Sequence, residues 1–207
     1  MGYPLVVSAN TKDLKILLLN ELYETILQRD IIDKYSIRKS TVLKAFINGM
    51  LESACRVVSA QTMTNYLSSQ MILISQQNGF KYLKNTHNIF LFFFLYPYSK
   101  KPKQRNTRPT LYLPDLGLMQ FANQDVSKRL GNQIFIELRK KTITELIQVC
   151  YSLKMPYTYT RETESLLKAS DVLKCNKRSI LTLNKEKTLK IKDKVIKVIP
   201  AWKWMLR

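Results

Sequence analysis

The sequence has few of the residues from which catalytic sites are commonly built. It contains one histidine, His87, and five glycines that are scattered along its 207 residues. A single histidine excludes most arrangements that use histidine as a general base, and it argues against a zinc site. The scattered glycines form neither a Gly-rich phosphate loop nor a Gly-x-Ser-x-Gly elbow. We therefore expect no cofactor and no metal.

Cysteine is scarce and irregularly placed. Cys55, Cys150 and Cys175 are far apart, and no two of them have the spacing of metal ligands. Because three thiols cannot all pair within one chain, a reducing interior is the natural compartment, and we expect a cytoplasmic protein.

Long apolar segments are missing as well. The most apolar run, residues 89–96, has eight residues, whereas a membrane helix needs about 20. The first residues of the chain lack the basic region of a signal peptide. We therefore expect no membrane partner and interpret residues 89–96 as a buried strand.

Acidic residues are outnumbered by basic ones. The chain has 15 Asp and Glu against 34 Lys and Arg, which gives a formal charge of +19. Such an excess favours a polyanionic partner, with nucleic acid ahead of an anionic membrane surface. A host with a generally basic proteome is the alternative explanation. The carboxylates show no cluster of the kind that holds Mg²⁺. Asp115 and Glu145 are the best candidates for metal ligands. The favoured interpretation is a helix cap for Asp115 and a solvated strand end for Glu145.

The stretch from Ser59 to Leu67 is typical of the second helix of a helix-turn-helix. Ser59 is a good N-cap, and an apolar stripe follows it at i, i+3 and i+4 spacing. Amide and hydroxyl side chains lie off that stripe, where they could reach base edges or phosphates. These candidate DNA-binding residues are Gln61, Thr62, Thr64 and Asn65. We expect the helix to continue to about Ser75, and we expect Gly79 to break the helical pattern. The alternative is a polar-faced helix that touches no DNA.

A basic segment separates two predicted strands, at residues 89–96 and 110–113. It contains two prolines, which oppose regular structure. Its basic residues are Lys100, Lys101, Lys103, Arg105 and Arg108. They suit contacts with DNA phosphates, and a solvated hairpin is the alternative. Together with the helices expected before Ser59, this hairpin predicts a winged helix over residues 1–113.

Residues 114–207 show a different pattern. The expected elements are helices at about 123–141 and 160–173, strands at 146–151 and 179–183, a hairpin over 187–199, and a short final helix with Trp202 and Trp204. A strand, a helix and a strand in this order predict a parallel βαβ unit. The expected fold class is therefore α+β or α/β, with a helical winged-helix unit followed by a small α/β domain.

Seven short stretches, taken in order, carry a resemblance to a known family. They are Gly2–Pro4, Leu22–Tyr23 with Arg29–Arg38, Val58–Leu67, Tyr112–Leu118, Asn132–Arg139, Glu145–Tyr151 and Val198–Trp204. Together they resemble the C-terminal part of an archaeal and bacterial family of AAA-type P-loop ATPases. In that family a winged helix and then a restriction-endonuclease-like domain follow the ATPase module. The resemblance implies the same two domains here.

The departures from that family bear on activity. The ATPase module has no counterpart before Gly2, so ATP hydrolysis is not expected. A segment that would carry an acidic strand looks deleted between Lys141 and Thr142. Gln148 stands near the place where an active nuclease of the family would have Lys or Glu. The resemblance therefore implies a truncated endonuclease-like domain that has lost catalysis.

These observations lead to one main hypothesis and three alternatives. The main hypothesis is a non-catalytic module that binds double-stranded DNA. The first alternative is an interaction subunit that docks on a separate P-loop ATPase. The second is a metal-dependent nuclease that uses Asp115 and Glu137, and the third is a decaying gene product with marginal folding.

Overall fold

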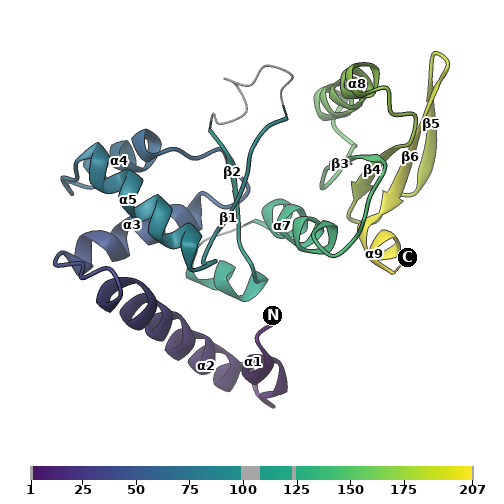
Figure 1. Ribbon diagram of the computed structural model, residues 1–207. Coiled ribbons are helices and arrows are strands. Elements are labelled where there is room, and N and C mark those ends of the chain that lie inside the picture. The colour runs from purple at the N-terminus through teal and green to yellow at the C-terminus, as the bar shows by residue number, and fades with distance from the viewer. Residues whose placement is uncertain (1, 99–107, 123–124, 207) are drawn as a thin grey trace. The chain divides into compact units, whose positions relative to one another are not determined.

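The structure is a computed structural model that describes residues 2–98, 108–122 and 125–206 (Figure 1). It divides into two compact units, Met1–Gln124 and Asp125–Arg207. Helices are combined with two small sheets, so the predicted mixed α and β fold class is confirmed. None of the described helices is both long enough and apolar enough to cross a membrane.

The division between the units falls later than the boundary expected after residue 113. A 3-10 helix, η2 (Leu116–Phe121), follows that residue and buries Leu118 and Met119 in the core of the first unit. The ring of Phe121 also stacks on that of Tyr23, with centroids 4.4 Å apart. Residues 114–122 belong to the first unit because these apolar side chains are buried there.

Helices make up most of the first unit. They are α1 (Pro4–Ser8), α2 (Lys12–Thr25), a π-helix (Ile26–Asp33) that continues α2, α3 (Ser40–Glu52), α4 (Ala60–Ser69) and α5 (Gln76–Asn88). The N-terminus of α2 is fixed by Thr11, whose side chain accepts a hydrogen bond from the Leu14 N–H at 3.2 Å. Such a cap satisfies one of the backbone donors that a helix start leaves unpaired.

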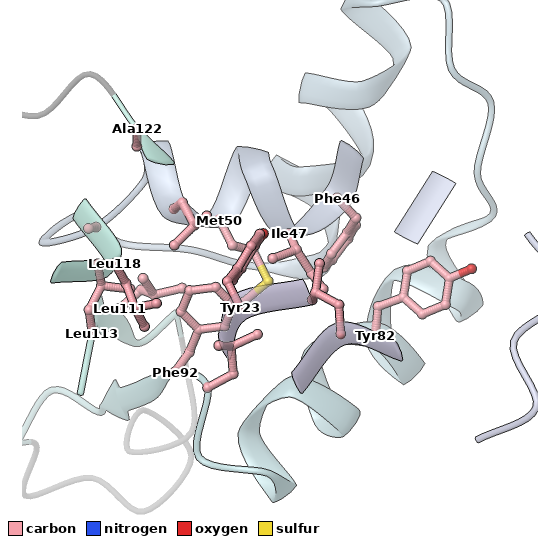
Figure 2. Packing of buried hydrophobic residues seen from close by; sticks show 14 of the residues in the cluster. Tyr23, Phe46, Ile47, Met50, Tyr82, Phe92, Leu111, Leu113, Leu118 and Ala122 are labelled. Carbon is pink, nitrogen blue, oxygen red and sulfur yellow. The ribbon is translucent and has the colours of Figure 1, made fainter. Parts of the chain in front are cut away.

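The core of the first unit brings together residues that are distant in the sequence (Figure 2). Phe46 of α3 is fully buried and meets Tyr82 of α5 edge-on, with ring centroids 5.4 Å apart. Phe92 and Leu111, from the segment after α5, are also fully buried. Burial of each such aliphatic or Phe side chain contributes about 1.5–3 kcal/mol. The core therefore fixes how α3, α5 and the following strands pack together.

Two short strands follow α5. β1 (Phe93–Leu95) and β2 (Thr110–Tyr112) pair antiparallel, so the predicted hairpin is present, although residues 99–107 lie outside the described part of the chain. The segment before α4 pairs with the other side of β2, where Val57 and Thr110 form an antiparallel bridge. β2 therefore lies between β1 and this segment.

Two local predictions for the first unit are wrong. α4 ends at Ser69 rather than near Ser75, and Gly79 lies inside α5 instead of breaking a helical pattern. The strand predicted at 89–96 is shorter than expected because Phe90 adopts a left-handed φ of 58°, which turns the chain before β1.

The second unit contains a four-stranded sheet with helices. Its elements are α7 (Val126–Leu138), β3 (Leu146–Val149), α8 (Pro156–Leu173), β4 (Arg178–Thr182), β5 (Lys187–Ile191), β6 (Lys194–Pro200) and α9 (Ala201–Met205). The strand order is β3-β4-β6-β5. β3 and β6 both pair parallel with β4, and β5 pairs antiparallel with β6. The predicted βαβ unit, hairpin and final helix are confirmed.

Side chains of this sheet contribute to two separate cores. Ile147 of β3 packs in the cluster that contains Trp204 of α9, and Leu146 packs in the cluster that contains Leu166 of α8. Successive side chains of a strand point to opposite faces of its sheet. The sheet is therefore covered by α7 and α9 on one face and by α8 on the other.

Candidate nucleic-acid interface

α4 and α5 form a helix pair joined by residues 70–75. Ser75 caps α5 by accepting a hydrogen bond from the Asn78 N–H at 3.2 Å. The helices approach closely at Gly79, where an added Cβ would lie 3.0 Å from the Thr64 Cγ2 and 3.6 Å from the Ala60 Cβ. A side chain at residue 79 would crowd Thr64, so glycine suits the close crossing of the two helices. α5, and not α4, is the second helix of the pair that is followed directly by the hairpin.

α5 exposes a face of amide and basic side chains. Its buried face consists of Gly79, Tyr82 and Thr86. The exposed residues are Gln76, Gln77, Asn78, Phe80, Lys81, Lys84, His87 and Asn88. Amides can read base edges in a DNA groove, and lysines can neutralise phosphates. α5 therefore presents amides of the kind predicted on α4, and it adds lysines.

α5 is not among the helices predicted from the sequence, because a glycine such as Gly79 is typical of a helix break. A usable signal was present in Ser75, a good N-cap, followed by Tyr82, Leu83 and Thr86 at helical spacing. A glycine inside a helical pattern often marks close packing rather than a helix end.

The four residues predicted on α4 have different environments. Ser59 and Thr62 form a capping box, in which the Thr62 N–H donates to the Ser59 Oγ at 3.1 Å and the Ser59 N–H donates to the Thr62 Oγ1 at 2.8 Å. Gln61 and Asn65 are exposed and bonded to each other, with the Gln61 Nε2 2.7 Å from the Asn65 Oδ1. Thr64 is only 6% exposed because it lies against α5. Thr64 is therefore not available to face a DNA groove.

The basic segment of the hairpin is described only in part. Lys100, Lys101, Lys103 and Arg105 lie outside the described residues. Arg108 is described, is exposed, and lines a groove of about 580 Å³ between α5, the start of α4 and the hairpin. Aromatic and basic side chains meet in this groove: Phe80, Lys84, His87, Phe94, Tyr96 and Arg108. Such interleaving of rings and cations is common on nucleic-acid-binding surfaces.

The only charged side chains between residues 52 and 115 are those of Lys and Arg, apart from the single histidine. No Asp or Glu occurs between Glu52 and Asp115, and these 62 residues contain eight Lys and Arg. They include α4, α5, β1 and β2. A stretch without negative side chains attracts polyanions more strongly than the total charge alone implies.

The carboxylates considered as nuclease residues have structural partners. Asp115 is the N-cap of η2. Glu137 accepts a hydrogen bond from the Lys140 ammonium at 3.1 Å, and Glu145 accepts one from the Ser179 hydroxyl at 2.9 Å. Within the described residues, no three His, Cys, Asp or Glu side chains are grouped so that they could hold a metal ion.

Gln148, near which the resemblance implies a lost catalytic residue, is half-buried and contacts a buried carboxylate. Its amide donates to the carboxylate of Glu162, which is 5% exposed. The same carboxylate accepts from the Arg161 Nε at 3.0 Å. The guanidinium and the amide together satisfy this buried charge, as buried carboxylates require.

Comparisons with known proteins bear on the family and not on the activity. Residues 2–130 match a family described as a domain of unknown function, DUF8612. The uncharacterized protein MJ1544 of Methanocaldococcus jannaschii is 27% identical over 238 aligned residues, which cover 99% of this chain and 53% of that protein. An uncharacterized protein of Haemophilus influenzae is 26% identical over 194 residues, which cover 82% of this chain and 48% of that protein. The chain thus spans about half the length of these relatives. No solved structure matches it.

Proposed function

The chain belongs to the family of the domain of unknown function DUF8612, and we propose that it is a non-catalytic module that binds double-stranded DNA through α5 and the β1–β2 hairpin. The observation that carries this proposal is the absence of any acidic residue from the 62 residues that contain α4, α5 and the hairpin strands. α5 adds exposed amides for base edges, and Lys81 and Lys84 for phosphates.

The order of elements supports the interpretation as a winged helix. α3 is followed by a segment that pairs with β2, then by the α4–α5 pair, and then by the hairpin. In helix-turn-helix proteins the second helix of the pair enters the major groove, and the first crosses the DNA backbone. By this geometry α5 reads bases, while Gln61 and Asn65 of α4 contact phosphates. The same proposal includes a relationship of this chain to the C-terminal part of AAA-type P-loop ATPases, which its sequence resembles.

A second candidate function is that of an interaction subunit. Large apolar side chains are exposed on α1 and α2, among them Leu5 (74% exposed) and Leu17 (53% exposed). Exposed apolar side chains on adjacent elements are a common feature of protein interaction sites. A separate P-loop ATPase subunit is the partner that this alternative requires.

The test is fluorescence anisotropy of a short random duplex with the full chain, from about 50 to 300 mM salt. We expect log K to fall linearly with log salt, with a slope of about −0.9 for each phosphate engaged. Lys81→Ala and Lys84→Ala should each reduce that slope by about 1.

The matched control is Lys44→Ala. It removes the same charge, but the Lys44 ammonium is already paired with the Glu24 carboxylate at 2.7 Å. This variant should keep the wild-type slope. Absence of binding at the lowest salt would contradict the proposal and favour the protein partner. Equal slope changes for Lys44→Ala and Lys84→Ala would contradict the assignment to α5.

A further inference from the structure

The groove beside α5 lies next to the face of that helix to which DNA binding is assigned. Residues three and four apart on a helix share one side, and α5 lines the groove with four residues at such spacing: Phe80, Leu83, Lys84 and His87. Gln77 and Lys81, one position away from Lys84 and Phe80 on the helix surface, lie on the adjoining exposed side. DNA held by that side would therefore pass the mouth of the groove.

Contacts between three segments fix the walls of the groove. The Phe94 ring of β1 stacks on the His87 ring of α5, with centroids 5.4 Å apart and planes 24° from parallel. On the other side, the Val58 N–H donates to the Pro109 carbonyl at 2.8 Å, which holds the start of α4 against the residue before β2. The groove is therefore formed by the packing of the unit, as ligand sites usually are.

The side chains of the groove combine exposed rings with positive charge. Phe80 is 59% exposed and Tyr96 is 50% exposed. Lys84 and Arg108 are exposed as well, and no carboxylate is found among the described residues that line the groove. A ligand that matches this set has a flat apolar ring system and a negative charge. An apolar peptide side chain could cover the rings, but it would leave both cations without a partner.

A nucleotide has both of these properties. Its base can stack on an aromatic side chain, and its phosphate can accept charge-assisted hydrogen bonds from an ammonium or a guanidinium group. The volume of the groove, about 580 Å³, falls in the range of about 300–1,000 Å³ that is usual for sites of small ligands. The groove is therefore large enough for one base with its sugar.

We propose that the groove holds one unpaired base of the bound DNA, which stacks on the Phe80 ring while Lys84 and Arg108 contact the phosphates beside it. This inference rests on the proposed DNA binding and adds a preference among DNA structures. A base inside a duplex is covered by its neighbours, and its extrusion costs free energy that an unpaired base does not cost. The chain should therefore prefer a duplex that continues into a single-stranded tail over a blunt duplex.

The test compares the affinity of the full chain for three DNAs by fluorescence anisotropy at one salt concentration. They are a blunt duplex, the same duplex with a short single-stranded tail, and the same duplex with an abasic tail of equal length. The two tails carry equal numbers of phosphates, so the difference between them measures the bases alone. We expect the tail with bases to bind about tenfold more tightly than the abasic tail, as one stacked base commonly provides.

Two phenylalanine variants locate the stacking. In Phe80→Ala the ratio of the two tail affinities should fall from about tenfold to about one, because the stacking ring is gone. The matched control is Phe90→Ala, which removes the same ring from a residue that is 66% exposed and does not line the groove. Its ratio should stay at the wild-type value. Circular dichroism establishes that both variants fold.

The failure of this inference differs from the failure of the proposed function. If the wild type binds the blunt duplex but binds both tails equally, only the inference is overturned. If it binds none of the three DNAs, DNA binding itself is overturned. A preference that Phe80→Ala retains would overturn the assignment to this groove. Saturable binding of free dAMP, measured by calorimetry, together with equal affinity for the two tails would show that the groove takes a free nucleotide and would overturn the assignment to DNA.

Discussion

Thr64 of α4 and Gly79 of α5 form the closest point of the helix pair. A Cβ added to Gly79 would lie 3.0 Å from the Thr64 Cγ2, which is tighter than ordinary van der Waals contact. This approach buries Thr64 and turns the amide and lysine side chains of α5 outward. The position of the proposed DNA-reading face therefore depends on a residue without a side chain.

Substitution of Gly79 tests that packing. Gly79→Leu should lower the free energy of unfolding by about 1–3 kcal/mol, because overpacking forces neighbouring atoms apart. Gly79→Ala gains about 1 kcal/mol of helix propensity, which the contact with Thr64 offsets. In a Thr64→Ala background the contact is gone, so Gly79→Ala should stabilise the protein. Urea denaturation of the four variants in a double-mutant cycle measures this, and strict additivity would contradict the contact.

The assignment of base reading to α5 predicts different effects for two asparagines. On a preferred sequence obtained by selection, Asn78→Ala should weaken binding by about 1–3 kcal/mol, the usual worth of one bidentate base contact. On a random duplex it should have little effect. Asn65→Ala on α4 should change the affinity for both duplexes to the same extent, because phosphate contacts carry no sequence information. Competition anisotropy measures both effects. If Asn65→Ala weakened binding only on the selected sequence and Asn78→Ala weakened both duplexes equally, α4 rather than α5 would be the helix that contacts the bases.

Asp115 tests the nuclease alternative. Its carboxylate accepts hydrogen bonds from the Gly117 N–H at 2.5 Å and from the Gly2 N–H, and the residue is 7% exposed. Asp115→Ala should therefore lower the free energy of unfolding by about 1.5–3 kcal/mol, the worth of hydrogen bonds to a charged group. We expect no Mg²⁺-dependent cleavage of plasmid DNA by the wild type. Cleavage that Asp115→Ala abolishes without a loss of stability would establish the nuclease alternative.

Cys150 should react slowly with thiol reagents in the folded protein. Burial raises the pKa of its thiol above the ordinary value of 9.0, so less thiolate is present at pH 8 than in an exposed cysteine. The raised pKa also means that the unfolded state loses this proton first as pH rises, so the stability due to this thiol is present below pH 9 and is lost above it. Ellman's reagent applied to a Cys55→Ser, Cys175→Ser variant, with and without urea, measures the first effect. Equal rates in both conditions would contradict burial of the thiol.

Local sequence patterns predicted the structure correctly where it depends on residues that are close together in the chain. The βαβ unit, the C-terminal hairpin and the final helix follow from apolar runs that alternate with a helical pattern, and all three are present. The cap at Ser59 was predicted correctly because capping depends on residues within one turn. The hairpin after α5 was also predicted, although its first strand was too long, since nothing in an apolar run marks the turn at Phe90.

The candidate interface could not be obtained in the same way. In the sequence, Gly79 is typical of a helix break, whereas in the structure it is the point where α5 contacts α4. The sequence pattern predicts that the Thr64 hydroxyl is exposed, whereas in the structure α5 packs against Thr64 and buries it. Both errors arise because the sequence does not show which face of a helix another helix will cover.

The sequence by itself determined the charge, the mixed fold class and the run of residues free of carboxylates, because composition and local periodicity do not depend on packing. Only the tertiary structure decided that α5 exposes the amide and lysine face, that Thr64 is buried, and that β3 and β5 are the edge strands of their sheet. These features result from contacts between segments that are distant along the chain. Such contacts are set by how apolar faces are buried together, and no single stretch of sequence specifies them.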